Sequence, residues 1–62
     1  MVTQFIDANI GIAVYINPAH VMSLRPDPED PDHFSIVKLR DGESIRVRGG
    51  HEEVAARLSR AA

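Results

Sequence analysis

The chain has 62 residues, of which 44% are apolar, with a formal net charge of −2 at pH 7 and no cysteine. This length predicts a single domain over residues 1–62, and the lack of cysteine excludes a disulfide framework. The negative net charge argues against a general nucleic-acid binder, whose affinity depends on clustered lysine and arginine that neutralise several phosphates.

A domain this short is expected to be marginally stable, because a single small core can bury only about 60% of the unfolded surface. Neither a disulfide nor a metal framework supplements that core, and association is the remaining common supplement. We therefore expect a homo-oligomer. The N-terminal residues lack the pattern of a signal peptide, and no segment approaches the roughly 20 apolar residues of a membrane span. We expect a cytoplasmic protein without a membrane span.

Two extended runs open the chain and predict a β-hairpin. Residues 2–6 and 12–16 are joined by turn-forming residues at 7–11. In the second run three β-branched residues share the face expected to meet the core, namely Ile12, Val14 and Ile16. Ala13 and Tyr15 share the opposite face.

The middle of the chain predicts a helical turn, a strand and a loop. Asn17 followed by proline favours one turn over 17–20, and residues 21–25 resume an extended run. Residues 26–33 hold three prolines and four carboxylates, which predict an exposed, extended loop. The acids of this loop do not form the pattern of a calcium loop, because the glycine of such a loop is missing.

A second hairpin is predicted over residues 34–48, and side-chain parity selects its register. With a three-residue loop at 40–42, Val37 opposes Ile45 and Ser35 opposes Val47. Val37, Leu39, Ile45 and Val47 then share the inward face, whereas a two-residue loop would divide the aliphatic residues between the faces.

The last segment, 51–60, predicts a helix that begins after Gly49-Gly50. It has acids in its first turn and arginines in its last turn, as the helix dipole favours, and Glu53 and Arg57 are spaced for an ion pair. Its apolar stripe consists of Val54, Leu58 and Ala61. A helix of about ten residues is marginal alone in water, so packing on the sheet must hold it.

The outward face of the second hairpin is the main candidate for binding. It carries Phe34, Ile36, Lys38, Ser44, Arg46 and Arg48, with Arg40 at the tip. Three interpretations remain open: a solvated strand face, a subunit contact through Phe34 and Ile36, and an RNA- or phosphate-contacting surface that uses Lys38, Arg40, Arg46 and Arg48.

The sequence contains no residue pattern typical of a catalytic or metal-binding site. His20, His33 and His51 do not have the i, i+4 spacing of paired ligands, and no serine stands in a nucleophile-elbow context. Glu52 and Glu53 would repel a phosphate from the helix N-terminus after the paired glycines. We expect no enzymatic activity, no metal and no cofactor.

The order of the elements resembles that of the small FlbD-like flagellar proteins. The matching stretches are 16–18, 36–39, 41–42, 45–47 and 52–54, with the apolar pair Val21 and Leu24. The resemblance implies a short-stranded fold and an accessory interaction protein, and it carries over no catalytic residue.

We therefore expect an α+β domain, a small antiparallel β-meander of four to five strands with one C-terminal helix packed on one face. The expected function is a non-enzymatic binding or assembly module that self-associates and contacts a protein or other macromolecular partner. The residues expected to bind the partner are Tyr15, Phe34, Ile36, Arg46 and Arg48. The alternative is the ligand or nucleic-acid binder described above.

Overall fold

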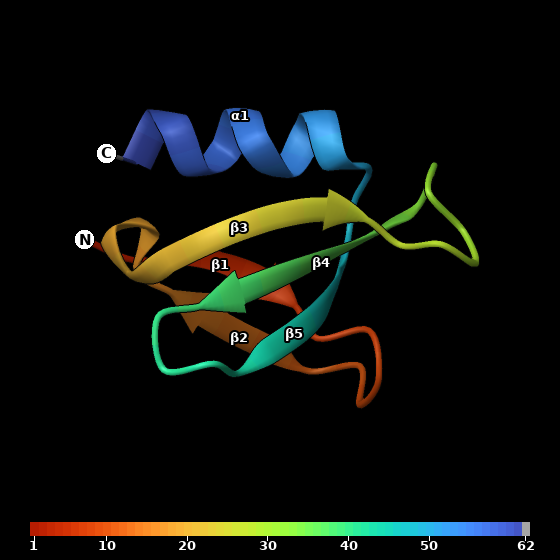
Figure 1. Cartoon of the computed structure of the whole chain (residues 1–62), viewed down its shortest axis with the longest axis horizontal. Helices are drawn as coiled ribbons and strands as arrows, with labels where there is room; N and C mark the ends of the chain where they lie inside the picture. Colours follow the sequence, from red (N-terminus) through yellow and green to blue (C-terminus); the bar gives the residue numbers. More distant parts are fainter. Residues whose placement is uncertain (62) are drawn as a thin grey trace.

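A computed structural model describes residues 1–61, the side chain of Ala61 excepted. It contains five strands, one 3-10 turn and one helix (Figure 1). In chain order these are β1 (Thr3–Ile6), β2 (Ala13–Ile16), η1 (Pro18–His20), β3 (Val21–Pro26), β4 (Phe34–Leu39), β5 (Ser44–Arg48) and α1 (His51–Ala61). The predicted α+β class, with antiparallel strands and a C-terminal helix, is confirmed.

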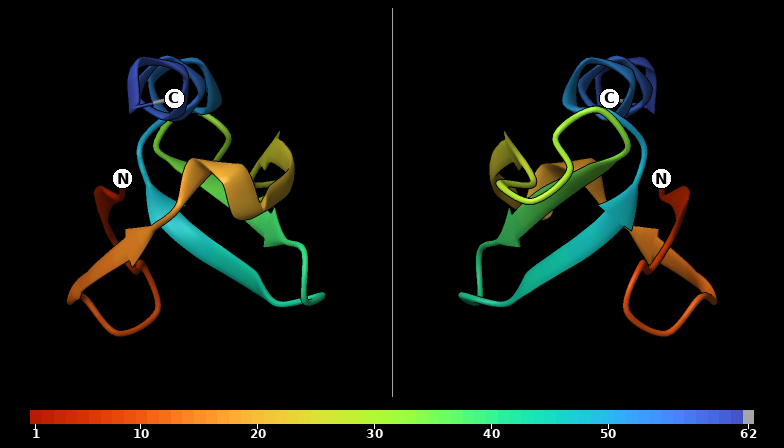
Figure 2. Two further views of the ribbon diagram at one scale, coloured as in Figure 1. Left: turned by 90° about the vertical axis from the view of Figure 1, so that its left-hand side faces the viewer. Right: turned by 90° about the vertical axis from the view of Figure 1, so that its right-hand side faces the viewer.

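The strands form two antiparallel sheets, the pair β1-β2 and the triple β3-β4-β5. A bridge between Asp7 and Val47 joins them, and the Ala8 amide donates to the Arg46 carbonyl over 2.7 Å. The end of β1 therefore lies between β2 and β5. In both views of Figure 2 the β1–β2 turn projects away from the three-stranded sheet, on the side opposite the β4–β5 turn.

The register predicted for the second hairpin is confirmed. Val37 pairs with Ile45 and Ser35 pairs with Val47. The Gly42 amide donates to the Leu39 carbonyl, and Gly42 has φ +93°, a conformation that favours glycine. The three-residue loop thus places Val37, Leu39, Ile45 and Val47 on the core face.

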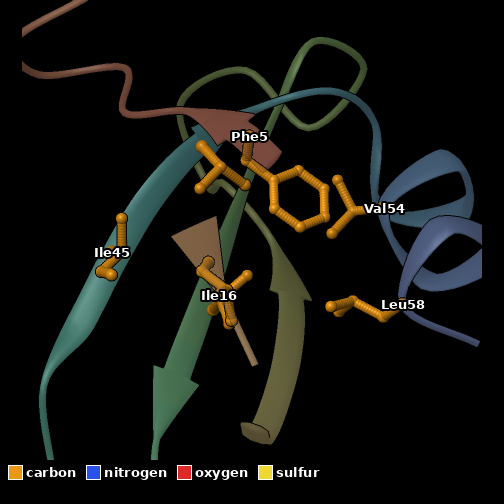
Figure 3. Packing of buried hydrophobic residues seen from close by; sticks show 7 residues of the cluster. Phe5, Ile16, Ile45, Val54 and Leu58 are labelled. Atoms are coloured by element: carbon orange, nitrogen blue, oxygen red, sulfur yellow. The ribbon is translucent and has the colours of Figure 1, made fainter. Parts of the chain in front are cut away.

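The core lies between that face, the β1–β2 hairpin and the helix. Its buried members are Phe5, Ile16, Val37, Ile45, Val47, Val54 and Leu58. The Phe5 ring points toward Val54 of the helix (Figure 3). Val54 and Leu58 are buried in this core, which confirms the predicted packing of the helix on the sheet. Burial of each side chain contributes about 1.5–3 kcal/mol. The side chain of Ala61, the third residue of the predicted stripe, lies outside the described part.

Gly49 sets the path from β5 into α1. Its φ is +121°, and a Cβ at this position would approach Cγ2 of Val54 to 3.1 Å. The hydroxyl of Ser35, which is fully buried, donates to the Gly49 carbonyl over 2.7 Å. Residues 49–50 thus connect β5 directly to the helix, which lies over the sheet (Figure 1).

Three local predictions are wrong. Ile12 precedes β2 and is 60% exposed, because it lies in the β1–β2 turn, which projects away from the three-stranded sheet (Figure 2). Asp27 is buried rather than exposed with the rest of its loop. Within the described residues Glu53 makes no ion pair with Arg57, whose guanidinium lies 4.5 Å from the Phe5 ring centroid and donates to the Gln4 carbonyl.

The helix turn at η1 follows the prediction. The Asn17 side chain accepts a hydrogen bond from the Ala19 amide over 3.0 Å, and Pro18 is the first helical residue. Over residues 1–61, none of the helical segments has the length and apolar character needed to cross a bilayer.

Candidate functional site

The outer face of the three-stranded sheet is arranged in cross-strand rows. Arg25 of β3 and Arg46 of β5 both pair with Ile36 of β4, so the three side chains share this face. Phe34 pairs with Arg48 in a neighbouring row. Phe34 and Ile36 are half-buried among these side chains. The apolar surface available here is smaller than the sequence indicated.

Arg46 is bound within the chain. Its Nε and Nη2 each lie 2.8 Å from the same Asp27 carboxylate oxygen, Oδ2. Its guanidinium carbon is 4.1 Å from the centroid of the Phe34 ring. The other oxygen of Asp27 accepts the Glu29 amide at 3.3 Å. The acidic loop is thus anchored on the basic face, and Arg46 is less available to an external anion.

The other predicted cations do not gather at one point. Lys38 and Arg48 are exposed on the outer face, whereas Arg40 lies in the β4–β5 turn, where its amide donates to the His20 carbonyl. Arg25 is an exposed cation of the same face that the sequence analysis missed. Side-chain alternation within β3 would have indicated it, because Arg25 follows Leu24, which packs against the core.

Tyr15 is separate from these residues and lies on β2. It is 63% exposed, and it pairs with Gln4 on the outward face of the β1–β2 hairpin. Two further large apolar side chains, Ile10 and Ile12, are exposed in the adjoining turn. The exposed, uncharged side chains at this end of the hairpin, Ile10, Ile12, Ala13 and Tyr15, are together called the β2 surface below.

One edge of β2 has no strand beside it in the described part of the chain. The Asp7 amide donates to the Ile12 carbonyl, so this pair is hydrogen-bonded. Because bonded and non-bonded pairs alternate along an antiparallel ladder, Val14 directs its backbone groups toward β1. Ala13 and Tyr15 direct theirs toward the open edge.

The other outer strand, β3, has features that protect natural edge strands from pairing with another chain. Its pairing with β4 is interrupted by a bulge between Val21 and Ser23, and Arg25 and Pro26 stand at its end. Residues 13–16 of β2 contain no bulge, proline or charged side chain. Such an edge is well suited to pairing with another strand.

His33 is the one histidine with a clear electrostatic partner. Its Nδ1 lies 3.0 Å from Oδ1 of Asp30, and this hydrogen bond raises the pKa of His33, with a further Coulombic contribution from Asp30. His20 and His51 lie on η1 and at the start of α1. Across residues 1–61, no three side chains of the metal-ligating types gather at one place.

Comparisons with protein-family models, with curated proteins and with solved structures each found no match.

Proposed function

We propose that this chain is a non-enzymatic assembly module that self-associates through the β2 surface and contacts a macromolecular partner with its remaining surface. The observation that carries the proposal is that β2 has both an open backbone edge and exposed, uncharged apolar side chains beside it. An unpaired edge offers backbone hydrogen bonds, and the apolar side chains offer burial on association.

Among the residues predicted to bind a partner, Tyr15 supports this proposal most strongly. Aromatic residues often dominate contact energy at interfaces, and Tyr15 is exposed on the same strand as the open edge. Phe34 and Ile36 are half-buried beside Arg46, so they offer less surface to a partner. The accessory role implied by the resemblance to FlbD-like proteins agrees with assembly and stays a prediction.

Sedimentation equilibrium tests the proposal. The wild-type chain is expected to show a mass that rises with concentration, and Tyr15→Lys should weaken association at least tenfold, because an edge lysine must lose water on pairing. Gln4→Lys is the matched control, since it adds the same charge to the same hairpin face on the inner strand. A wild-type chain that stays monomeric at high micromolar concentration would overturn the proposal.

A second candidate function is anion or RNA binding by the basic outer face. Arg25 favours it, because this residue adds an exposed cation to Lys38 and Arg48. Titration with labelled RNA and DNA at two salt concentrations tests this function, since phosphate contacts weaken steeply with salt. Absence of binding at low salt would remove it.

A further inference from the structure

We infer that the occupant of the open edge is β2 of a second copy, paired antiparallel about a two-fold axis that passes through Val14. This inference rests on the proposed self-association and specifies its geometry. Antiparallel pairing of identical strands is the arrangement that a two-fold dimer produces. The resulting four-stranded unit would run β1-β2 of one copy into β2-β1 of the other.

Side-chain parity restricts where the axis can lie. Directly opposed residues of an antiparallel pair point to the same face of the sheet. Ala13 and Tyr15 point outward, whereas Val14 and Ile16 point toward the core. An axis between two residues would oppose outward with inward side chains, so the axis must pass through a residue.

Backbone hydrogen bonding then selects Val14 among the residues of the strand. With the axis there, Ala13 opposes Tyr15 of the second copy, and the reverse pair forms by symmetry. Both residues direct their backbone groups to the open edge, so all of these groups find partners within β2. An axis at Ala13 would instead place Tyr15 opposite Gly11, which lies outside the strand. An axis at Tyr15 would place Ala13 opposite Asn17, which also lies outside it.

The side chains of this arrangement are also compatible. The small Ala13 lies opposite the large Tyr15 on the outer face, and no charge lies within residues 13–16 to meet its own copy. A strand carrying lysine or glutamate here would oppose like charges to one another or bury them. A second copy therefore fits this edge without electrostatic cost.

The contact must extend beyond the four residues of β2 to reach the area of a stable dimer interface. A standard interface buries about 800 Å² of each partner, roughly a fifth of the 4068 Å² surface of this chain. In this arrangement the β1–β2 turn of the second copy, with its exposed Ile10, comes to the end of β2, near Pro18. A hollow of about 520 Å³ opens there, lined mainly by apolar groups from Met1, Pro18, Ala19, Val21 and Leu58. The exposed Ile10 and this hollow supply the additional apolar contact.

Disulfide cross-linking tests the register, because the chain has no cysteine of its own. Residues on the axis form a non-hydrogen-bonded pair with Cα atoms about 4.5 Å apart, within the range of a disulfide. Val14→Cys should therefore cross-link at least about tenfold faster than the control Gln4→Cys under mild oxidation. Thermal unfolding of each reduced variant verifies that it folds.

A mixture of two other variants tests the same register without changing Val14. Ala13→Cys and Tyr15→Cys should cross-link to each other, and each alone should remain mostly uncross-linked. Faster self-linking of either variant alone would place the axis elsewhere and overturn the inference. A dimeric mass with no cross-link at residues 13, 14 or 15 would overturn the strand pairing but leave self-association standing. A monomeric wild-type mass would overturn both.

Discussion

Asp27 and Arg46 lie 19 positions apart in the sequence, yet Nε and Nη2 of Arg46 both lie 2.8 Å from one carboxylate oxygen of Asp27. The carboxylate is almost fully buried, and the arginine also lies over the Phe34 ring. This ion pair joins the start of the acidic loop to β5. It explains why a loop rich in proline and acid has a defined position on the sheet.

Asp27→Ala is expected to destabilise the fold by about 1.5–3 kcal/mol, because it removes charged hydrogen bonds and leaves Arg46 partly buried without its partner. Urea unfolding measures the change. A double-mutant cycle with Arg46→Met should give a coupling energy of about 0.5–3 kcal/mol. Glu29→Ala, in the same loop and exposed, is the control and should change stability little. A coupling energy near zero would contradict the proposed anchor.

Leu58→Ala tests the docking of the helix. Leu58 is buried in the core, so we expect a loss of about 2–5 kcal/mol in the free energy of unfolding. Ser59→Ala changes an exposed neighbour on the same helix and serves as the control. An unchanged melting temperature for Leu58→Ala would show that the helix is not held by this contact.

Gly49→Ala separates backbone strain from steric contact when it is compared with Gly42→Ala. Both glycines have positive φ, but a Cβ at Gly42 meets no atom within 4 Å, whereas one at Gly49 would meet Val54 at 3.1 Å. We expect Gly42→Ala to cost about 1 kcal/mol and Gly49→Ala to cost clearly more. Equal losses in chemical denaturation would mean that the contact with the helix relaxes freely.

The His33–Asp30 pair predicts a pH dependence of the loop. Because Asp30 raises the folded-state pKa of His33 above the unfolded value, the stabilisation is complete below that unfolded value and is lost as pH rises through the folded pKa. In an NMR titration the His33 midpoint should lie above 6.5, the ordinary pKa of histidine. Asp30→Asn should lower the midpoint; an unchanged midpoint would contradict the role of Asp30.

The hairpin register was predictable because side chains alternate with a period of two, so only one loop length places Val37 and Ile45 together on the core face. The burial of Asp27 was not predictable, because its partner Arg46 is far along the chain and loop acids are usually solvated. Arg57 is similar: its contact with Gln4 crosses 53 positions and replaces the local pair with Glu53 that helical spacing favours.

For the candidate site, exposure of Tyr15 followed from strand parity, but the open edge of β2 did not. An edge is defined by the order of strands in space, and that order depends on the long-range contact of Asp7 with Val47. A hairpin pattern alone leaves unknown which of its two strands is the outer one. The structure supplies this order, and with it the contrast between the protected β3 edge and the open β2 edge.

Amide hydrogen exchange across a concentration series tests the central claim, self-association through β2, most directly. The amides of Ala13 and Tyr15 should exchange rapidly in dilute solution and slow down as the dimer forms. The Val14 amide, which faces β1, should be protected at every concentration and is the internal control. Rapid exchange of Ala13 and Tyr15 at all concentrations, including those at which the mass has doubled, would contradict the account.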